Sequence, residues 1–89
     1  MELKITNLQW TPHMGGEHAQ VDFPNGYGAS CLRGGPFYTK NGTYEIGVLH
    51  DGGLDYSTPI TNGVLGYLTE EEANKTLADI AALPAKEAA

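Results

Sequence analysis

Three histidines and one cysteine are the residues of this chain that could bind a metal ion. His13 and His18 lie in a glycine-rich stretch with Glu17 between them, whereas His50 and Cys31 lie elsewhere. Zinc is held by three or four cysteine, histidine or carboxylate ligands. The spacing matches no zinc signature and the ligands would come from separate loops, so we expect no metal and no cofactor. His13, His18 and His50 remain the candidate ligands if the chain is a small metal-dependent enzyme.

Cys31 is also the candidate nucleophile, because a cysteine beside a histidine base can attack a substrate. It is the only cysteine, so no disulfide can form within the chain. The surrounding residues, Ala29-Ser30-Cys31-Leu32, are typical of a half-buried strand, in which a free cysteine packs as a small apolar side chain. Ser30 and Ser57 lie outside any Gly-x-Ser-x-Gly pattern. We therefore predict a chain that is not an enzyme.

The charge of the chain favours protein partners over nucleic acid. Its 89 residues carry a net charge of -6, and residues 45–89, with two lysines and eight carboxylates, account for all of it. An acidic chain is not attracted to phosphate backbones, so we expect no direct binding to nucleic acid. With 40% hydrophobic and 18% charged residues, the chain should fold as a single domain over residues 1–89.

Amphipathic aromatic and acidic side chains supply the candidate binding surface. Tyrosine is enriched at protein interfaces, and carboxylates steer the approach of a basic partner. Glutamates at the start of a helix also have a purely structural explanation, which leaves fewer of them for a partner. The candidate partner-binding residues are Tyr38, Asp51, Asp55, Tyr56, Glu70, Glu71 and Asp79.

Glycines and prolines divide the first two thirds of the chain into strand-sized segments. The apolar residues of segment 3–10 predict a first strand, and residues 13–18 predict a loop. Alternating apolar residues predict a second strand over residues 19–23. A turn at residues 24–26 should lead into a third strand over residues 27–33.

A hairpin is predicted around Asn41-Gly42, because both residues suit the positive φ angles of a two-residue type I′ turn. In that register Thr39 pairs with Tyr44. Tyr38 then points to the solvated face of the sheet, which makes it a candidate anchor for a partner.

A second turn is predicted at residues 51–53, and burial decides its length. A two-residue Asp51-Gly52 loop would place Asp55 opposite Val48, a position that faces the core, and a two-residue Gly52-Gly53 loop would place it opposite His50 on the same face. A three-residue loop with Gly53 in the left-handed conformation sends Asp55 outward, so we predict the longer loop.

One amphipathic helix is predicted over about residues 70–83. Thr69 and Glu72 have the spacing of a capping box, and Pro84 should end the helix. Lys75 and Asp79 are spaced to form an ion pair on its surface.

These elements predict an α+β fold. Consecutive hairpins make an antiparallel β-meander of four to six strands within about residues 2–57, and the single C-terminal amphipathic helix needs that sheet to bury its apolar face. Residues 86–89 are expected to be a frayed tail.

Residues 44–83, YEIGVLHDGGLDYSTPITNGVLGYLTEEEANKTLADIAAL, combine a strand pair around an Asp-Gly turn, a Thr-Pro linker, Gly66-Tyr67-Leu68 and a helix that starts with acidic residues. In these features the chain resembles small accessory proteins encoded by bacteriophages and prophages. The resemblance covers under half of the chain and implies a protein that binds host machinery. Some such proteins, among them anti-CRISPR proteins, are acidic inhibitors of complexes that handle nucleic acids.

The start of the chain, Met-Glu-Leu-Lys-Ile-Thr-Asn, lacks the basic and then apolar segments of a signal peptide. No apolar run reaches the ~18 residues of a membrane span. We therefore expect a protein of the host bacterial cytoplasm that makes no contact with the membrane.

The leading hypothesis is a non-enzymatic, acidic binding protein of phage type. It would dock on, and inhibit, a host protein or defence complex with a basic surface. One alternative is a homo-oligomeric or virion-associated structural module, for example a homodimer that pairs exposed sheet edges. The second alternative is the small metal-dependent enzyme.

Overall fold

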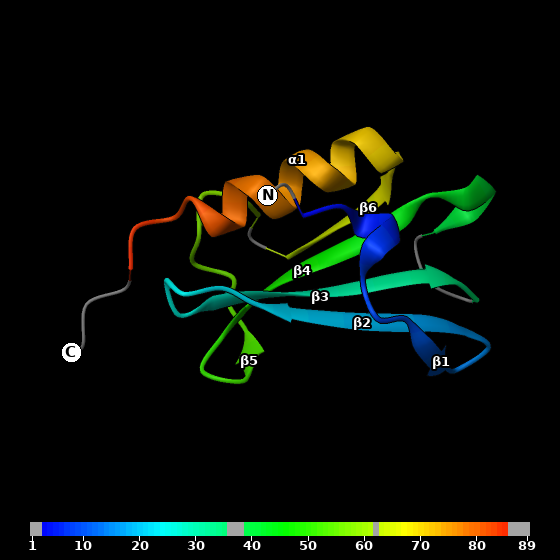
Figure 1. Ribbon diagram of the computed structural model, residues 1–89, viewed down its shortest axis with the longest axis horizontal. Helices are drawn as coiled ribbons and strands as arrows, with labels where there is room; N and C mark the ends of the chain where they lie inside the picture. The colour runs from blue at the N-terminus through cyan, green and yellow to red at the C-terminus, as the bar shows by residue number, and fades with distance from the viewer. Residues whose placement is uncertain (1–2, 36–38, 62, 86–89) are drawn as a thin grey trace.

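Six antiparallel strands and one helix form two layers in the computed structural model of the chain (Figure 1). The structure describes residues 3–35, 39–61 and 63–85. The elements are β1 (Thr11–His13), β2 (Gly16–Asp22), β3 (Tyr27–Gly34), β4 (Tyr44–His50), β5 (Gly53–Leu54), β6 (Val64–Leu68) and α1 (Glu70–Ala81). The predicted α+β fold, with an antiparallel meander and one C-terminal helix packed on it, is confirmed. The predicted second and third strands correspond to β2 and β3.

The meander runs in the order β1-β2-β3-β4, and the far edge of β4 is shared by two strands. β5 pairs with the end of β4, where Leu54 lies opposite Leu49, and β6 pairs with its start, where Leu68 lies opposite Tyr44. The predicted strand range of about 2–57 is therefore wrong, because it leaves out β6. Local sequence could not place β6, since its hydrogen-bonding partner is more than one hairpin away.

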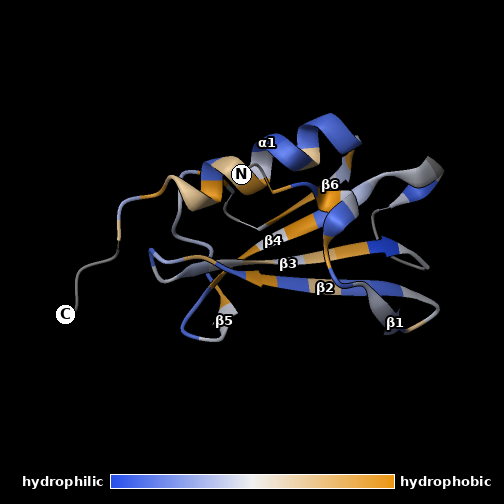
Figure 2. Ribbon diagram, in the orientation of Figure 1, coloured by the Kyte–Doolittle hydropathy of each residue, from blue (hydrophilic) through white to orange (hydrophobic). Residues whose placement is uncertain are grey.

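The strand register divides the sheet into a covered face and an open face. Side chains alternate along each strand, and α1 packs against β3, β4 and β6 on the covered face. Figure 2 shows hydrophilic colouring over the first half of α1 and hydrophobic residues along the strands beneath it. The buried apolar residues of the core are Ile5, Ala19, Tyr27, Ala29, Cys31, Tyr44, Ile46, Val48, Ala73, Leu77 and Ile80.

The segment predicted as a first strand forms a short 3-10 helix, Ile5–Asn7, so this prediction is wrong. Ile5 is fully buried, and its N–H donates to the side-chain Oδ1 of Asn74 on α1 at 2.7 Å. The hydrogen bond to a residue near the other end of the chain replaces the strand pairing that local alternation suggested. Figure 1 shows this segment lying beside α1 on the covered face.

Residues 13–18 form the β1–β2 hairpin rather than the predicted loop. His13 pairs with Gly16 around a two-residue turn, and both turn residues have positive φ, 48° at Met14 and 85° at Gly15. These angles define a type I′ turn. Methionine is not a residue that usually signals this turn, which is why the sequence reading missed the hairpin.

The predicted pairing of Thr39 with Tyr44 is wrong, because both edges of β4 are occupied at that point. Tyr44 lies between Arg33 of β3 and Leu68 of β6. The predicted type I′ turn at Asn41-Gly42 is also wrong, because Lys40–Gly42 forms a short 3-10 helix that leads into β4. Phe37 and Tyr38 lie outside the described residues.

The turn after β4 has two residues, not the predicted three. His50 pairs with Gly53, and the turn residues Asp51 and Gly52 have φ angles of 53° and 79°. This turn places Asp55 beside Val48, and the N–H of Asp55 donates to the Val48 carbonyl at 2.8 Å. The arrangement is tolerated because β5 ends there.

The helix α1 begins with the predicted capping box. The Thr69 N–H donates to Oε1 of Glu72 at 2.9 Å, and the Glu72 N–H donates to Oγ1 of Thr69 at 3.2 Å. The helix ends at Ala81 rather than at residue 83, and Pro84 follows as predicted. The Lys75–Asp79 ion pair is confirmed, with 2.7 Å between Nζ and Oδ2.

The capping box predicts a measurable pH dependence. Hydrogen bonds from the backbone N–H and the side chain of Thr69 hold the pKa of Glu72 below its ordinary value. The stability that this carboxylate contributes is therefore present above the ordinary glutamate pKa of about 4.3, and is lost as the pH falls through the lower pKa of the folded state. We expect the melting temperature to fall in that range more steeply for the wild type than for Glu72→Gln, which keeps an acceptor but cannot titrate. Equal slopes for the two proteins would contradict this assignment.

Candidate functional site

The histidines fall into two places that no single metal ion can reach. His13 and His18 lie side by side on the β1–β2 hairpin with 5.6 Å between ring centroids and the rings tilted by 49°, and His18 Nε2 lies 2.9 Å from Oγ of Ser30. His50 lies at the end of β4 against the ring of Tyr27, 5.1 Å between centroids. Among residues 3–35, 39–61 and 63–85 no group of three or more histidine, cysteine or acidic side chains could hold a metal ion.

Cys31 lies on the opposite side of the sheet from His18. It is fully buried on the covered face, and burial raises the pKa of its thiol to about 12. Only the thiolate is nucleophilic, so this thiol stays protonated and inert at neutral pH. Packing in the core accounts for the residue.

The acidic residues predicted to bind a partner do not gather on one face. Asp51 follows the end of β4, whereas Glu70 and Glu71 follow β6, whose Leu68 pairs with the start of β4. The length of β4 separates these groups by about 20 Å. The two glutamates lie in the first turn of α1, where they complement the helix dipole.

The remaining predicted residues are scattered as well. Asp79 is half-buried on α1 and pairs with Lys75. Asp55 accepts hydrogen bonds from the backbone N–H of Ser57 at 2.8 Å and from its hydroxyl at 2.5 Å. Tyr56 follows β5 and is 53% exposed. Tyr38 lies outside the described residues, so its predicted role remains a prediction.

A surface that the sequence reading missed is the apolar strip of the open face. We use this name for Leu32, Leu49, Leu54 and Val64, whose strand positions all point away from α1. Leu54 and Val64 are 44% and 37% exposed. They meet over Gly47, where an added Cβ would lie 2.6 Å from Leu54 Cδ2 and 3.3 Å from Val64 Cγ1. Glycine at this position lets the two side chains lie flat on the sheet.

The charged residues that the described strands and turns place around the apolar strip are Asp22, Glu45 and Asp51, which are acidic. At one end, Asp22 and Asp51 border a shallow depression of about 50 Å³ beside Leu49. At the other end, Glu45 lies opposite Leu32. The described strands contain one lysine or arginine, Arg33, and its position faces the covered side, whereas His18 lies opposite Leu32 on the open face. The open face therefore combines an exposed apolar centre with a negative margin.

Arg33 instead forms part of a polar cluster on the covered face. Its Nε donates to Oε1 of Glu17 at 2.9 Å, and its guanidinium lies 4.2 Å from the centre of the Trp10 ring. Trp10 also packs near Tyr44, with 6.0 Å between ring centroids, and its Nε1 donates to the Ile5 carbonyl at 3.0 Å. These contacts attach the N-terminal segment to the sheet.

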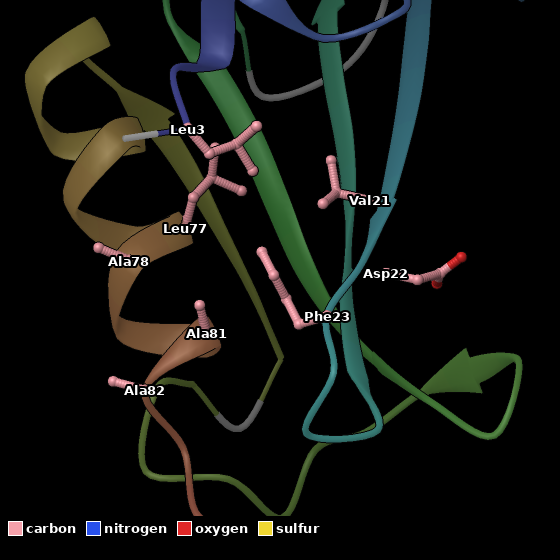
Figure 3. A pocket seen from close by; sticks show the side chains of 8 residues that line it. All are labelled: Leu3, Val21, Asp22, Phe23, Leu77, Ala78, Ala81 and Ala82. Carbon is pink, nitrogen blue, oxygen red and sulfur yellow. The ribbon is translucent and has the colours of Figure 1, made fainter. Parts of the chain in front are cut away.

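A second hollow lies between α1 and β2 on the covered face (Figure 3). It is an open groove of about 590 Å³ with mostly apolar walls. Leu77 and Ala81 of α1 face Val21 of β2 and Phe23, which follows it, across the groove, and Leu3 lies at its upper end. Asp22 points away from the groove in this view.

Comparison of the chain with protein-family models, with curated proteins and with solved structures found no match. Among the described residues, no helix is long and apolar enough to cross a bilayer. The surfaces of the molecule itself are therefore the basis for a functional proposal.

Proposed function

We propose that this chain is a non-enzymatic binding protein that docks on a partner protein through the open face of its sheet. The observation that carries the proposal is the apolar strip, where Leu54 and Val64 remain 44% and 37% exposed on a sheet that has a helix on its other side only. Contiguous exposed apolar side chains with a polar margin are typical of protein interaction sites.

The margin of this face supports a partner with a basic surface. Asp22, Glu45 and Asp51 surround the apolar strip, and no lysine or arginine of the described strands points to it. Opposite charges around an apolar centre increase the association rate and select against acidic partners. In keeping with the resemblance to phage accessory proteins, we propose that the partner is a host protein or complex and that binding inhibits it.

The test compares three tagged proteins in affinity purifications from a bacterial host lysate. The wild type should retain a partner that the double variant Leu54→Lys/Val64→Lys loses. With that partner purified, we expect the double variant to bind on the order of 30-fold more weakly or worse, because central apolar contacts typically contribute 2 kcal/mol or more. Wild-type affinity should also decrease as salt is added.

The matched control is Glu70→Gln/Glu71→Gln, which raises the net charge by the same two units, but on α1. This variant should retain the partner if the open face is the docking site. The proposal is wrong if the α1 variant loses the partner and the open-face variant keeps it.

Self-association through the open face is the second candidate, since an apolar strip can also pair with a second copy. Two copies face to face would bring their acidic margins together, which opposes this pairing. A homo-oligomeric or virion-associated role requires a dimer or larger species in sedimentation equilibrium, and requires Leu54→Lys to dissociate it.

A further inference from the structure

The outer edge of β2 is open beyond the short strand β1. β1 pairs with residues 16–18 only, and within the described part of the chain no strand continues along this edge. The N–H of Phe23 donates to the Tyr27 carbonyl on β3 at 2.8 Å. Because backbone groups alternate along an antiparallel strand, those of Gln20 and Asp22 point away from β3. Two consecutive hydrogen-bonding positions of β2 therefore face an open edge.

The apolar groove borders this open edge on the covered face (Figure 3). Its floor includes Val21, which lies between Gln20 and Asp22, and its wall includes Ala78 and Ala81 of α1. The volume of about 590 Å³ is within the range of pockets that bind ligands. Side chains of a strand added to β2 would alternate between this groove and the open face.

The carboxylate of Asp22 at this edge determines which side chains of an added strand are favoured on the open face. The Asp22 carboxylate lies toward the open face, since a Cβ built on Gly28 would lie 2.9 Å from its Oδ1. Its Oδ1 accepts a 3.3 Å hydrogen bond from Nε2 of the exposed Gln20. A residue of the added strand that pairs beside Asp22 would place its side chain next to this carboxylate, which favours lysine or arginine.

We infer that the open edge of β2 binds an extended peptide segment of a partner protein as an additional strand. The segment places an apolar side chain in the groove between α1 and β2, and a lysine or arginine beside Asp22. Backbone hydrogen bonds to Gln20 and Asp22 supply affinity, and the groove and the carboxylate supply sequence preference. The site uses none of the apolar-strip residues and shares only Asp22 with the margin of the open face, so the inference does not rest on the proposed function.

A display library of random linear peptides, selected against the purified chain, tests the inference. We expect enriched peptides to alternate apolar residues with lysine or arginine. The strongest of them should protect the amides of Gln20 and Asp22 from hydrogen exchange. Methylating the peptide nitrogens that face β2 should weaken binding by about 10-fold or more, because it removes backbone hydrogen bonds without altering the protein. No enrichment, or enrichment of acidic peptides, overturns the inference.

Protein variants then locate the peptide. Ala81→Trp fills the groove from an exposed position and should weaken binding by about 10-fold or more, whereas Ala85→Trp, beyond the end of α1, should not. The inference is overturned if Ala81→Trp binds the peptide with wild-type affinity while its circular dichroism spectrum shows that the variant is folded. The inference is also overturned if, without any peptide, the hydrogen-exchange protection of the Gln20 and Asp22 amides increases with protein concentration. In that case the edge of β2 pairs with a second copy of the chain. The open-face variant Leu54→Lys/Val64→Lys should bind the peptide with wild-type affinity. Peptide binding therefore tests the β2 edge independently of the proposed docking through the open face.

Discussion

Replacement of Asn25 by alanine is expected to destabilise the protein by about 2–3 kcal/mol, although the residue lies in a turn. Its Nδ2 donates to three carbonyls at the C-terminal end of α1, those of Ile80 at 2.9 Å, Ala81 at 3.2 Å and Leu83 at 2.9 Å. Its Oδ1 accepts the N–H of Tyr27 at 3.0 Å. One amide thus caps the helix from the β2–β3 turn and joins the two layers, and alanine leaves these backbone groups without the partner.

Urea unfolding followed by circular dichroism measures this loss, with two comparison variants. Asn25→Asp keeps an acceptor for Tyr27 but brings a negative charge to the negative end of the helix dipole, so it should be at least as unstable as Asn25→Ala. Gln20→Ala removes an exposed amide and should change the stability by less than about 0.5 kcal/mol. An Asn25→Asp protein as stable as the wild type would show that the hydrogen bonds to α1 contribute little.

The parts of the fold that were predicted correctly are those whose stabilising contacts are local. The alternation in β2 and β3, the turn at residues 24–26 and the Thr69–Glu72 capping box each depend on residues within a few positions of one another. The wrong predictions concern pairings between distant segments. Ile5 is bound to Asn74, and β4 is paired with β6, and neither partner can be identified from local periodicity.

The candidate site was harder to predict because exposure depends on which face the helix covers. Leu49 and Val48 look equally apolar in the sequence, yet Val48 is fully buried and Leu49 belongs to the open face. The length of the β4–β5 turn decides that Leu54 lies opposite Leu49. A three-residue turn would instead place Leu54 opposite His50 on the covered face, so the predicted turn length did not indicate the apolar strip. The clustering of carboxylates in the second half of the sequence was no guide, because β4 separates Asp51 from Glu70 and Glu71 in space.

Replacement of Trp10 by alanine is expected to destabilise the protein by about 3 kcal/mol, the lower end of the range for large aromatic residues because the ring is only half-buried. The ring contacts Arg33 and Tyr44, and its Nε1 donates to the Ile5 carbonyl. Trp10→Phe keeps the ring contacts and loses the hydrogen bond, so we expect a loss of about 1 kcal/mol. Met14→Ala, at a side chain that is 72% exposed, is the control and should change the stability by less than about 0.5 kcal/mol.

A double-mutant cycle shows whether Trp10 and Asn74 hold the N-terminal segment as one unit. Both bind the backbone of Ile5, Asn74 at its N–H and Trp10 at its carbonyl. If release of one bond frees the segment, Trp10→Phe combined with Asn74→Ala should cost clearly less than the two separate losses added together. Additive losses would show that the two bonds act independently. Because Leu3 lies at one end of the groove, a segment released in this way should also alter peptide binding at the β2 edge, whereas the binding of a partner to the open face should not change.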